Sequence, residues 1–380
     1  TIENLRVRLV DRPQPAAGEG EGDEAAPFLL PIDPTTFVMD AKFDIPDLSL
    51  KDKVREGTMQ FPRLSGTLTA RDLTKQVLLK LTGQGTYSSP TVAEASEPVV
   101  MNVDVNLAEA VGADGHLTLA QATALVDAVL KSIPVALVDG LTGAEGHALA
   151  ALGEQVSFDA DARLTRGEGP VDAQFVATNA KGEVLGKVAG GKFTVDRSLK
   201  AEFTVTEDLG RMILKKVNPI METAYTADKP ITLVIDPAQG GALEFPVTGE
   251  FSIDQVKITN ATLDLGKLKM KPGGVLAGLM KLAGRQRDGD SSLWFSPLVI
   301  SMANGKIEYQ KRLDVLIDES FHFMMWGFAK LNTAEEEGKD NSKVKVFIGF
   351  GRDTLDQAFG LDEATDKDLF VIPIKGKLSS

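Results

Sequence analysis

Apolar and polar residues alternate along most of the chain. Between residues 37 and 45, Phe37, Met39, Ala41, Phe43 and Ile45 are apolar, and charged residues stand at three of the four positions between them. Successive side chains of a β-strand point to opposite faces, so this pattern predicts a strand with one apolar and one polar face. The same alternation recurs often enough to predict roughly 18 to 22 strands.

Further alternating segments lie on both sides of this one. The predicted strands before the middle of the chain are 1–10, 37–50, 57–68, 74–86 and 99–107. Residues 155–206 contain four or five strands with turn residues between them, the spacing of an antiparallel meander. Later strands are predicted at 231–235, 243–247, 251–265 and 268–270. Helices of crossover length do not alternate with these strands, which favours an antiparallel sheet.

Four segments carry helical rather than strand patterns. Thr118 is a possible N-cap, and Leu119, Ala122, Val126, Val129, Leu130 and Ile133 form a stripe that ends at Pro134, which predicts a helix over 118–133. Asp208 can cap a second helix that ends near Pro219, and 274–282 and 354–359 are predicted as short helices. Gly140, Gly143 and Gly146 argue against one long regular helix between 135 and 152.

These patterns divide the chain into four regions. We expect N-terminal strands in 1–110 with an acidic loop at 11–27, and a helical insertion in 111–153. An antiparallel meander with a helix near 208–218 occupies 154–297, and a C-terminal module occupies 298–380. The predicted fold is mainly β: a long, strongly curved antiparallel sheet that forms a groove, with a few short amphipathic helices at its ends or mouth.

Composition and charge restrict the possible partners. The net charge of −13 argues against nucleic acid and against electrostatic docking on anionic membranes. The chain has no cysteine, which rules out disulfides and thiolate metal sites, and no run of 18 apolar residues. It has no initiator Met and no signal peptide, so we expect it to be a piece of a longer protein whose membrane anchor lies outside this sequence.

No pattern of catalytic or metal-binding residues stands out. His116, His147 and His322 lie outside any HExxH or GxSxG motif, and the glycine-rich segments lack the frame of a phosphate loop. Asp159 and Asp161 share a strand face, where a solvated edge is the simpler interpretation. We therefore expect no enzyme activity, no metal and no cofactor, and a polysaccharide-active enzyme is the weakest of the alternatives.

The C-terminal module carries the most specific signals. Asn304-Gly305 separates two alternating segments, which is typical of a β-hairpin, and strands at 313–317, 321–328 and 344–350 follow. Pro373 places the last strand, 369–378, at an edge, a bulge or a strand end. The order of the NGKIEYQ hairpin, the TLDQAFG segment and the closing IPIKGKL strand resembles the C-terminal module of AsmA-like proteins of Gram-negative envelopes, which belong with the bridge-like lipid-transfer proteins.

The resemblance implies a periplasmic protein, anchored to the inner membrane, whose apolar groove shields the acyl chains of phospholipids or other lipids as they pass between the inner and outer membranes or during outer-membrane biogenesis. Proteins of both membranes are possible partners. The residues expected to face lipid are the large apolar ones on alternating strand faces: Phe158, Phe175, Phe193, Phe203, Phe251, Ile253, Ile300, Met302, Ile307, Val346 and Ile348. Alternation does not distinguish lipid from protein as the covering layer, so an ordinary β-sandwich core remains open for each of them. The competing hypothesis is a non-enzymatic surface or assembly domain of stacked β-sandwiches that binds protein partners through an exposed strand edge.

Overall fold

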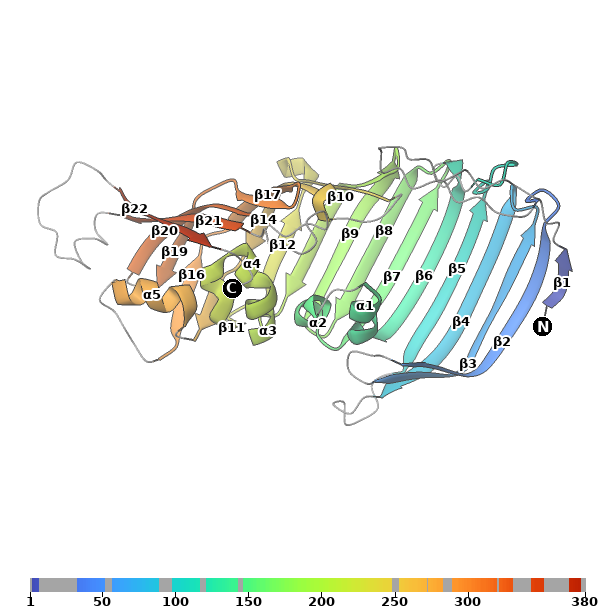
Figure 1. Ribbon diagram of the computed structural model, residues 1–380, viewed down its shortest axis with the longest axis horizontal. Helices are drawn as coiled ribbons and strands as arrows, with labels where there is room; N and C mark the ends of the chain where they lie inside the picture. Colours follow the sequence, from blue (N-terminus) through green and yellow to red (C-terminus); the bar gives the residue numbers. More distant parts are fainter. Residues whose placement is uncertain are drawn as a thin grey trace, which may run out of the picture.

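The computed structural model describes residues 2–6, 33–51, 57–88, 98–116, 121–142, 146–247, 253–271, 273–282, 289–319, 321–330, 343–351 and 369–376. Within these residues the chain forms 22 strands joined in one sheet, and every pairing between strands is antiparallel. A few short helices accompany the sheet (Figure 1). The predicted mainly β fold with a large antiparallel sheet is therefore confirmed.

The first ten strands follow one another across the sheet in sequence order, because each pairs with the next. Their bounds are β1 (Ile2–Arg6), β2 (Val38–Lys51), β3 (Thr58–Arg71), β4 (Gln76–Ser88), β5 (Val99–Ala108), β6 (Thr123–Pro134), β7 (Gln155–Leu164), β8 (Gly169–Ala177), β9 (Ala180–Ala189) and β10 (Lys192–Phe203). The register shifts between Gln60 and Arg63 in β3 and between Leu130 and Ile133 in β6. Such bulges bend a strand and increase its twist.

After β10 the sheet is more compact. The remaining strands are β11 (Ala224–Ala227), β12 (Ile231–Ile235), β13 (Ala242–Pro246), β14 (Lys257–Asp264), β15 (Lys267–Met270), β16 (Ser291–Phe295), β17 (Leu298–Ala303), β18 (Lys306–Tyr309), β19 (Leu313–Ile317), β20 (Phe321–Lys330), β21 (Lys343–Gly351) and β22 (Leu369–Gly376). One row of pairings continues from β10 through β12, β14, β17, β18 and β20 to β21 and β22. A second row, β11, β15, β16 and β19, also joins β20. The sheet therefore branches at β20.

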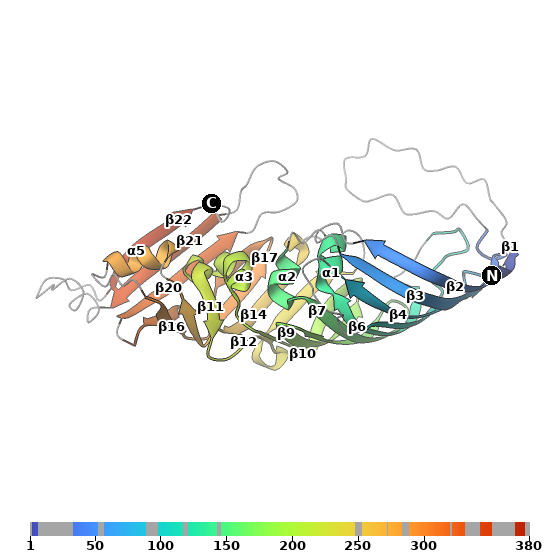
Figure 2. The ribbon, with the colours of Figure 1, turned by 90° about the horizontal axis from the view of Figure 1, so that it is seen from below.

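The helices α1 (Val135–Thr142), α2 (His147–Leu152), α3 (Glu207–Leu209), α4 (Lys215–Val217) and α5 (Gly274–Leu282) lie on one side of the sheet (Figure 2). The chain also forms a π-helical turn at Gly210–Leu214 and 3-10 turns at Pro219–Thr223, Pro237–Gln239 and Ile253–Gln255. Figure 2 shows the sheet bent toward this side, so that β2 and β3 at one end and β21 and β22 at the other rise beside the helices.

Burial differs sharply between the two halves of the molecule. The largest apolar cluster contains fully buried residues such as Leu293, Phe323 and Ile348, and all of its buried members lie between Val205 and Ile348. Strands β1–β10 contribute two much smaller buried clusters, one around Phe61 and one around Phe193. In Figures 1 and 2 the described part of β2–β9 is a single layer, with α1 and α2 beside its strand ends on the side nearest the C-terminal half. The closed core of the protein thus lies almost entirely in its C-terminal half.

The helix predicted for 118–133 is wrong, because residues 123–134 form strand β6. Every residue from Thr123 to Leu130 pairs with β5, and β7 pairs along the other edge. The stripe that indicates a helix also contains a period of two, in which Ala124, Val126, Ala128 and Leu130 share a face. Backbone hydrogen bonds to β5 on one edge and to β7 on the other stabilise the strand. The β-branched residues Thr123, Val126 and Val129 also lower the propensity of this segment to form a helix.

Other predictions have clear outcomes. Helices near 208–218 and at 274–282 are confirmed, although Thr206 rather than Asp208 caps the first, accepting a hydrogen bond from the Leu209 amide at 3.2 Å. The Asn304-Gly305 hairpin joins β17 to β18, and β22, which contains Pro373, pairs only with β21 among the described strands. Ile253 lies in a 3-10 turn instead of the predicted strand, since β14 begins at Lys257. The acidic loop 11–27, Phe251 and the 354–359 helix lie outside the described residues.

Candidate functional site

The register of β3–β9 places apolar residues directly beside apolar residues across seven strands. One row of paired positions runs Leu68, Leu79, Val105, Val126, Ala162 and Val171. The next row runs Leu81, Val103, Ala128, Ala160, Ala173 and Val184, and a third runs Met101, Leu130, Phe158 and Phe175. Directly paired residues, and residues two apart in one strand, point to the same side of a sheet. We call these sixteen residues the open apolar face.

All sixteen side chains are only partly buried. Residues at equivalent positions farther along the same sheet, such as Leu263 and Leu298, are 7% and 1% exposed because the C-terminal core covers them. Strands lie about 4.8 Å apart, so the open apolar face extends about 30 Å across the sheet. A continuous apolar area of this size is unusual on the surface of a soluble protein and typically marks a binding site.

On this side of the sheet, glycines lie next to phenylalanines and leave room for the aromatic rings. A Cβ atom at Gly182 would lie 2.6 Å from Cε1 of Phe175, and one at Gly186 would lie 2.4 Å from Cζ of Phe193. The rings therefore lie over the neighbouring strand where a side chain is missing, instead of standing upright. Phe43 lies over Gly66 in the same manner. Aromatic rings placed over glycine in this way also restore packing that the glycine lacks.

Helices α1 and α2 cover part of this side of the sheet and form one unit. The buried carboxylate of Asp139 in α1 accepts hydrogen bonds from the amides of Gly146 and Ala148 at 2.6 and 3.0 Å, which caps α2. Leu137 of α1 packs against the cluster around Phe61, and Ala151 of α2 packs against the C-terminal core. The two helices thus link the open apolar face to the closed half of the protein.

The C-terminal half closes the other end of the apolar side. The buried Asn218 fixes the segment after α4, because its amide contacts Sδ of Met325 at 3.4 Å and its carbonyl accepts from the Ile220 amide at 3.1 Å. The hydroxyl of Tyr309 donates to the carbonyl oxygen of Val217 at 2.7 Å, and burial raises the pKa of this hydroxyl. These buried hydrogen bonds hold the helical segment firmly over the strands.

The predicted lipid-facing residues fall into two groups. Phe158 and Phe175 belong to the open apolar face, and their ring centroids are 6.3 Å apart. Phe193 stacks on Phe245 at 4.9 Å, and Phe203 packs against the C-terminal core. Ile300, Met302, Ile307 and Ile348 are buried in that core, at most 8% exposed, so protein covers them. Val346 occupies β21 two residues before Ile348, and nothing further is described of its side chain.

The small aliphatic residues of the open apolar face were not among these candidates. Examples are Val103, Val126 and Ala160, which lie in the centre of the face and carry no aromatic ring. The alternation of apolar and polar residues in β5, β6 and β7 predicts one apolar face on each of these strands. The residues of β6 were missed because 118–133 was predicted to be a helix.

The opposite face of these strands is polar and contains an acidic row. Asp104, Asp127, Asp161 and Asp172 stand directly opposite one another on β5, β6, β7 and β8. Three of them have ion-pair partners, namely Lys80, Arg163 and Arg197, whereas Asp127 has none among the described residues. Like charges at directly opposite positions destabilise a sheet. The row therefore marks the solvent side, in contrast to the apolar side.

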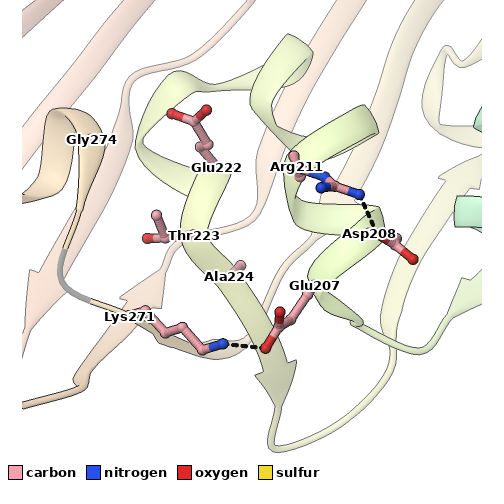
Figure 3. A pocket seen from close by; sticks show the side chains of 8 residues that line it. All are labelled: Glu207, Asp208, Arg211, Glu222, Thr223, Ala224, Lys271 and Gly274. Carbon is pink, nitrogen blue, oxygen red and sulfur yellow. Dashed lines mark hydrogen bonds and ion pairs between the residues drawn. The ribbon is translucent and has the colours of Figure 1, made fainter.

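Sites of polar chemistry lie away from the open apolar face. A pocket of about 560 Å³ at α3 and the start of α5 is lined by acidic and basic side chains that pair with one another, including Arg211 with Asp208 at 2.7 Å and Lys271 with Glu207 (Figure 3). His322 contacts Asp314 at 3.3 Å, and His147 contacts Lys216 at 2.6 Å. The described residues contain no group of three His, Cys, Asp or Glu side chains able to hold a metal ion.

Comparisons with known proteins identify no relative. No family model, curated protein or solved structure matches this chain. None of the helices in the described part of the chain is long and apolar enough to span a membrane. The open apolar face therefore has to be interpreted from its own chemistry.

The contact between Phe175 and Gly182 leads to a stability prediction. Gly182→Ala is expected to lower the free energy of unfolding by about 1–3 kcal/mol, because the added methyl group meets the Phe175 ring and the Lys200 carbonyl oxygen at 2.9 Å. Gly278→Ala in α5 is the control, since its Cβ would have no neighbour within 4 Å. It should raise the same free energy by about 0.5–1 kcal/mol. Denaturant titration measures both, and an unchanged stability of Gly182→Ala would contradict the close contact.

The acidic row leads to a second prediction. Asp127→Asn should raise the free energy of unfolding by about 0.2–1 kcal/mol at low salt, because it removes repulsion from two opposite aspartates without breaking an ion pair. Asp104→Asn is the matched control, since it also removes the partner of Lys80 at 2.6 Å. The gain should shrink as salt is added, since surface charges are then screened. Destabilisation by Asp127→Asn at low salt would show that the row is not repulsive.

Proposed function

We propose that the chain binds the acyl chains of lipids on its open apolar face. The observation that carries this proposal is the continuous alignment of sixteen partly exposed apolar side chains across β3–β9, without a second sheet over them among the described residues. Removing an acyl chain from water is favourable by about 0.8 kcal/mol for each CH₂ group. A smooth face of valine, alanine and leucine supplies this contact without demanding one chain length.

Transfer along such a face requires no covalent step and no cofactor. A lipid tail that slides from one strand to the next exchanges one apolar contact for another, so the barrier of exposing it to water is avoided. The rings of Phe175 and Phe193 lie over Gly182 and Gly186 instead of projecting from the sheet. This supports the proposal, because such rings do not obstruct a lipid tail that moves along the face. The C-terminal core then forms a closed end beside β10.

The resemblance to AsmA-like proteins supports a location in the cell envelope. On this proposal the chain is a periplasmic lipid-binding or lipid-transfer module, held at the inner membrane by a segment outside this sequence. It moves phospholipid or another acyl lipid between the inner and outer membranes or contributes to outer-membrane biogenesis. Proteins of the two membranes are its proposed partners.

The competing hypothesis of stacked β-sandwiches requires a second layer over the apolar strands. Such a covered core is present after Val205, whereas the described part of β3–β9 is covered locally by α1 and α2. A protein partner that adds a strand at a sheet edge would leave the open apolar face in water, which is unfavourable. Lipid accounts for this face directly.

Two adjacent residues of β6 provide a matched test. Val126 lies on the open apolar face, and Leu125 is 49% exposed on the opposite face. Val126→Asp should reduce the lipid that co-purifies with the protein ~10-fold or more, because a carboxylate against acyl chains loses its hydration. Leu125→Asp adds the same charge to the same strand and should leave the lipid content unchanged.

Organic extraction followed by mass spectrometry measures the bound lipid, and circular dichroism verifies that both variants keep their strand content. Equal lipid content in the two variants, or none in the parent protein after expression in a Gram-negative host, would exclude binding on this face.

A further inference from the structure

The last three strands of the sheet are basic, in contrast to the rest of the chain. Strands β20, β21 and β22 contain Lys330, Lys343, Lys345 and Lys375 and no aspartate or glutamate, although the whole chain has a net charge of −13. The acids of this region belong to the connecting segments 331–342 and 352–368, which lie outside the described residues. Within these three strands, which lie at one end of the molecule (Figure 1), every Asp, Glu, Lys or Arg position is therefore a lysine.

The register brings these lysines together in pairs. Lys330 is directly opposite Lys343, and Lys345 is directly opposite Lys375. Like charges at directly opposite positions are unfavourable in an isolated sheet, and an anionic partner removes the penalty. The arrangement therefore points to a ligand with several negative charges.

Aromatic side chains share this face with the lysines. In β20, Phe323 and Met325 point into the C-terminal core, so the alternating residues Trp326 and Phe328 point away from it and are partly exposed. Trp326 stacks on Phe347 with ring centroids 5.8 Å apart. Lys345 lies 5.3 Å above the ring of Phe347, and Lys306 lies 4.3 Å above the ring of Phe328. Two lysines thus lie over aromatic rings on this face, and one of them, Lys306, also forms an ion pair with Glu308 of the same strand.

The same surface extends to the second tryptophan. Trp294 of β16 is 45% exposed and is opposite Leu316 of β19, which is opposite His322 of β20. This register places Trp294 on the face of the sheet that carries Trp326. Both tryptophans of the chain therefore lie on the face turned away from the closed core.

We propose that this lysine–aromatic face of β20–β22 docks on the surface of a bilayer that contains anionic lipids. Tryptophan is enriched where membranes meet water, and clustered lysines are attracted to anionic headgroups, each by an energy that corresponds to ~5-fold in affinity. The inference is independent of acyl-chain binding, because it uses the opposite face of the sheet. It also modifies the expectation from net charge, since docking depends on the local charge at the contact.

Vesicle binding tests this proposal on the full chain. Co-sedimentation with phosphatidylcholine vesicles that contain phosphatidylglycerol should be clear, and binding to phosphatidylcholine vesicles alone should be weak. The double variant Lys330→Gln/Lys345→Gln should bind the anionic vesicles ~25-fold more weakly, given ~5-fold for each lysine. Lys131→Gln/Lys187→Gln changes the net charge equally on distant strands and should bind like the parent.

Tryptophan fluorescence reports the same contact directly, because the chain contains two tryptophans. Trp294→Phe leaves Trp326 as the only tryptophan, and its emission should shift to the blue when anionic vesicles are added. Added salt should reverse the shift, since the attraction is screened over about 10 Å at 0.1 M ionic strength.

Three outcomes would overturn the proposal: equal binding to both kinds of vesicle, an equal loss of binding in both double variants, or binding to heparin without binding to vesicles. The last result would identify a polyanion other than a membrane as the partner. Val126→Asp separates this proposal from the previous one, because it should lose bound lipid and keep vesicle binding.

Discussion

The shared register of the antiparallel ladder is the constraint on which the rest of the structure depends. From β3 to β9 each strand pairs with its neighbour so that Leu79 meets Val105, Val105 meets Val126, and Val126 meets Ala162. A slip of one residue in any of these strands would turn its apolar residues to the polar side. The bulge in β6 lies beyond Leu130, next to α1, so it bends the strand end without interrupting the apolar rows.

This register collects apolar side chains on one side of the sheet, where exposure to water is unfavourable, and the two halves of the protein cover them differently. After Val205 the apolar side of the sheet is covered by the second row of strands and by the helical segment that Asn218 and Tyr309 hold in place. Before it, α1 and α2 cover only part of the strands. The remaining apolar surface needs an apolar partner, and a lipid tail fits a broad face of small aliphatic residues better than a protein with its own fixed shape does. On this account the closed half supplies the stability and the open half supplies the binding surface.

Much of this architecture follows from the sequence, because alternation is a local property. The strands of the meander, the Asn304-Gly305 hairpin and the edge position of Pro373 are each predicted from a few residues. The helix expected over 118–133 failed because its apolar stripe fits both periods, and only pairing with β5 and β7 decides between them. The burial of Ile300 and Ile348 could not be predicted either, since it depends on pairings between strands about 40 residues apart in the chain, such as β11 with β15 and β14 with β17. Alternation identified apolar faces, but which of them is covered is a property of the tertiary structure.

Photocrosslinking with a lipid that carries a photoreactive acyl chain tests the central claim most directly. On this account the crosslinks mapped by mass spectrometry fall on residues of the open apolar face, such as Leu79, Val105 and Val126, and skip Leu78 and Leu125, which are adjacent in sequence but point the other way. Crosslinks distributed equally over both sets of positions, or confined to strands after β10, would contradict it.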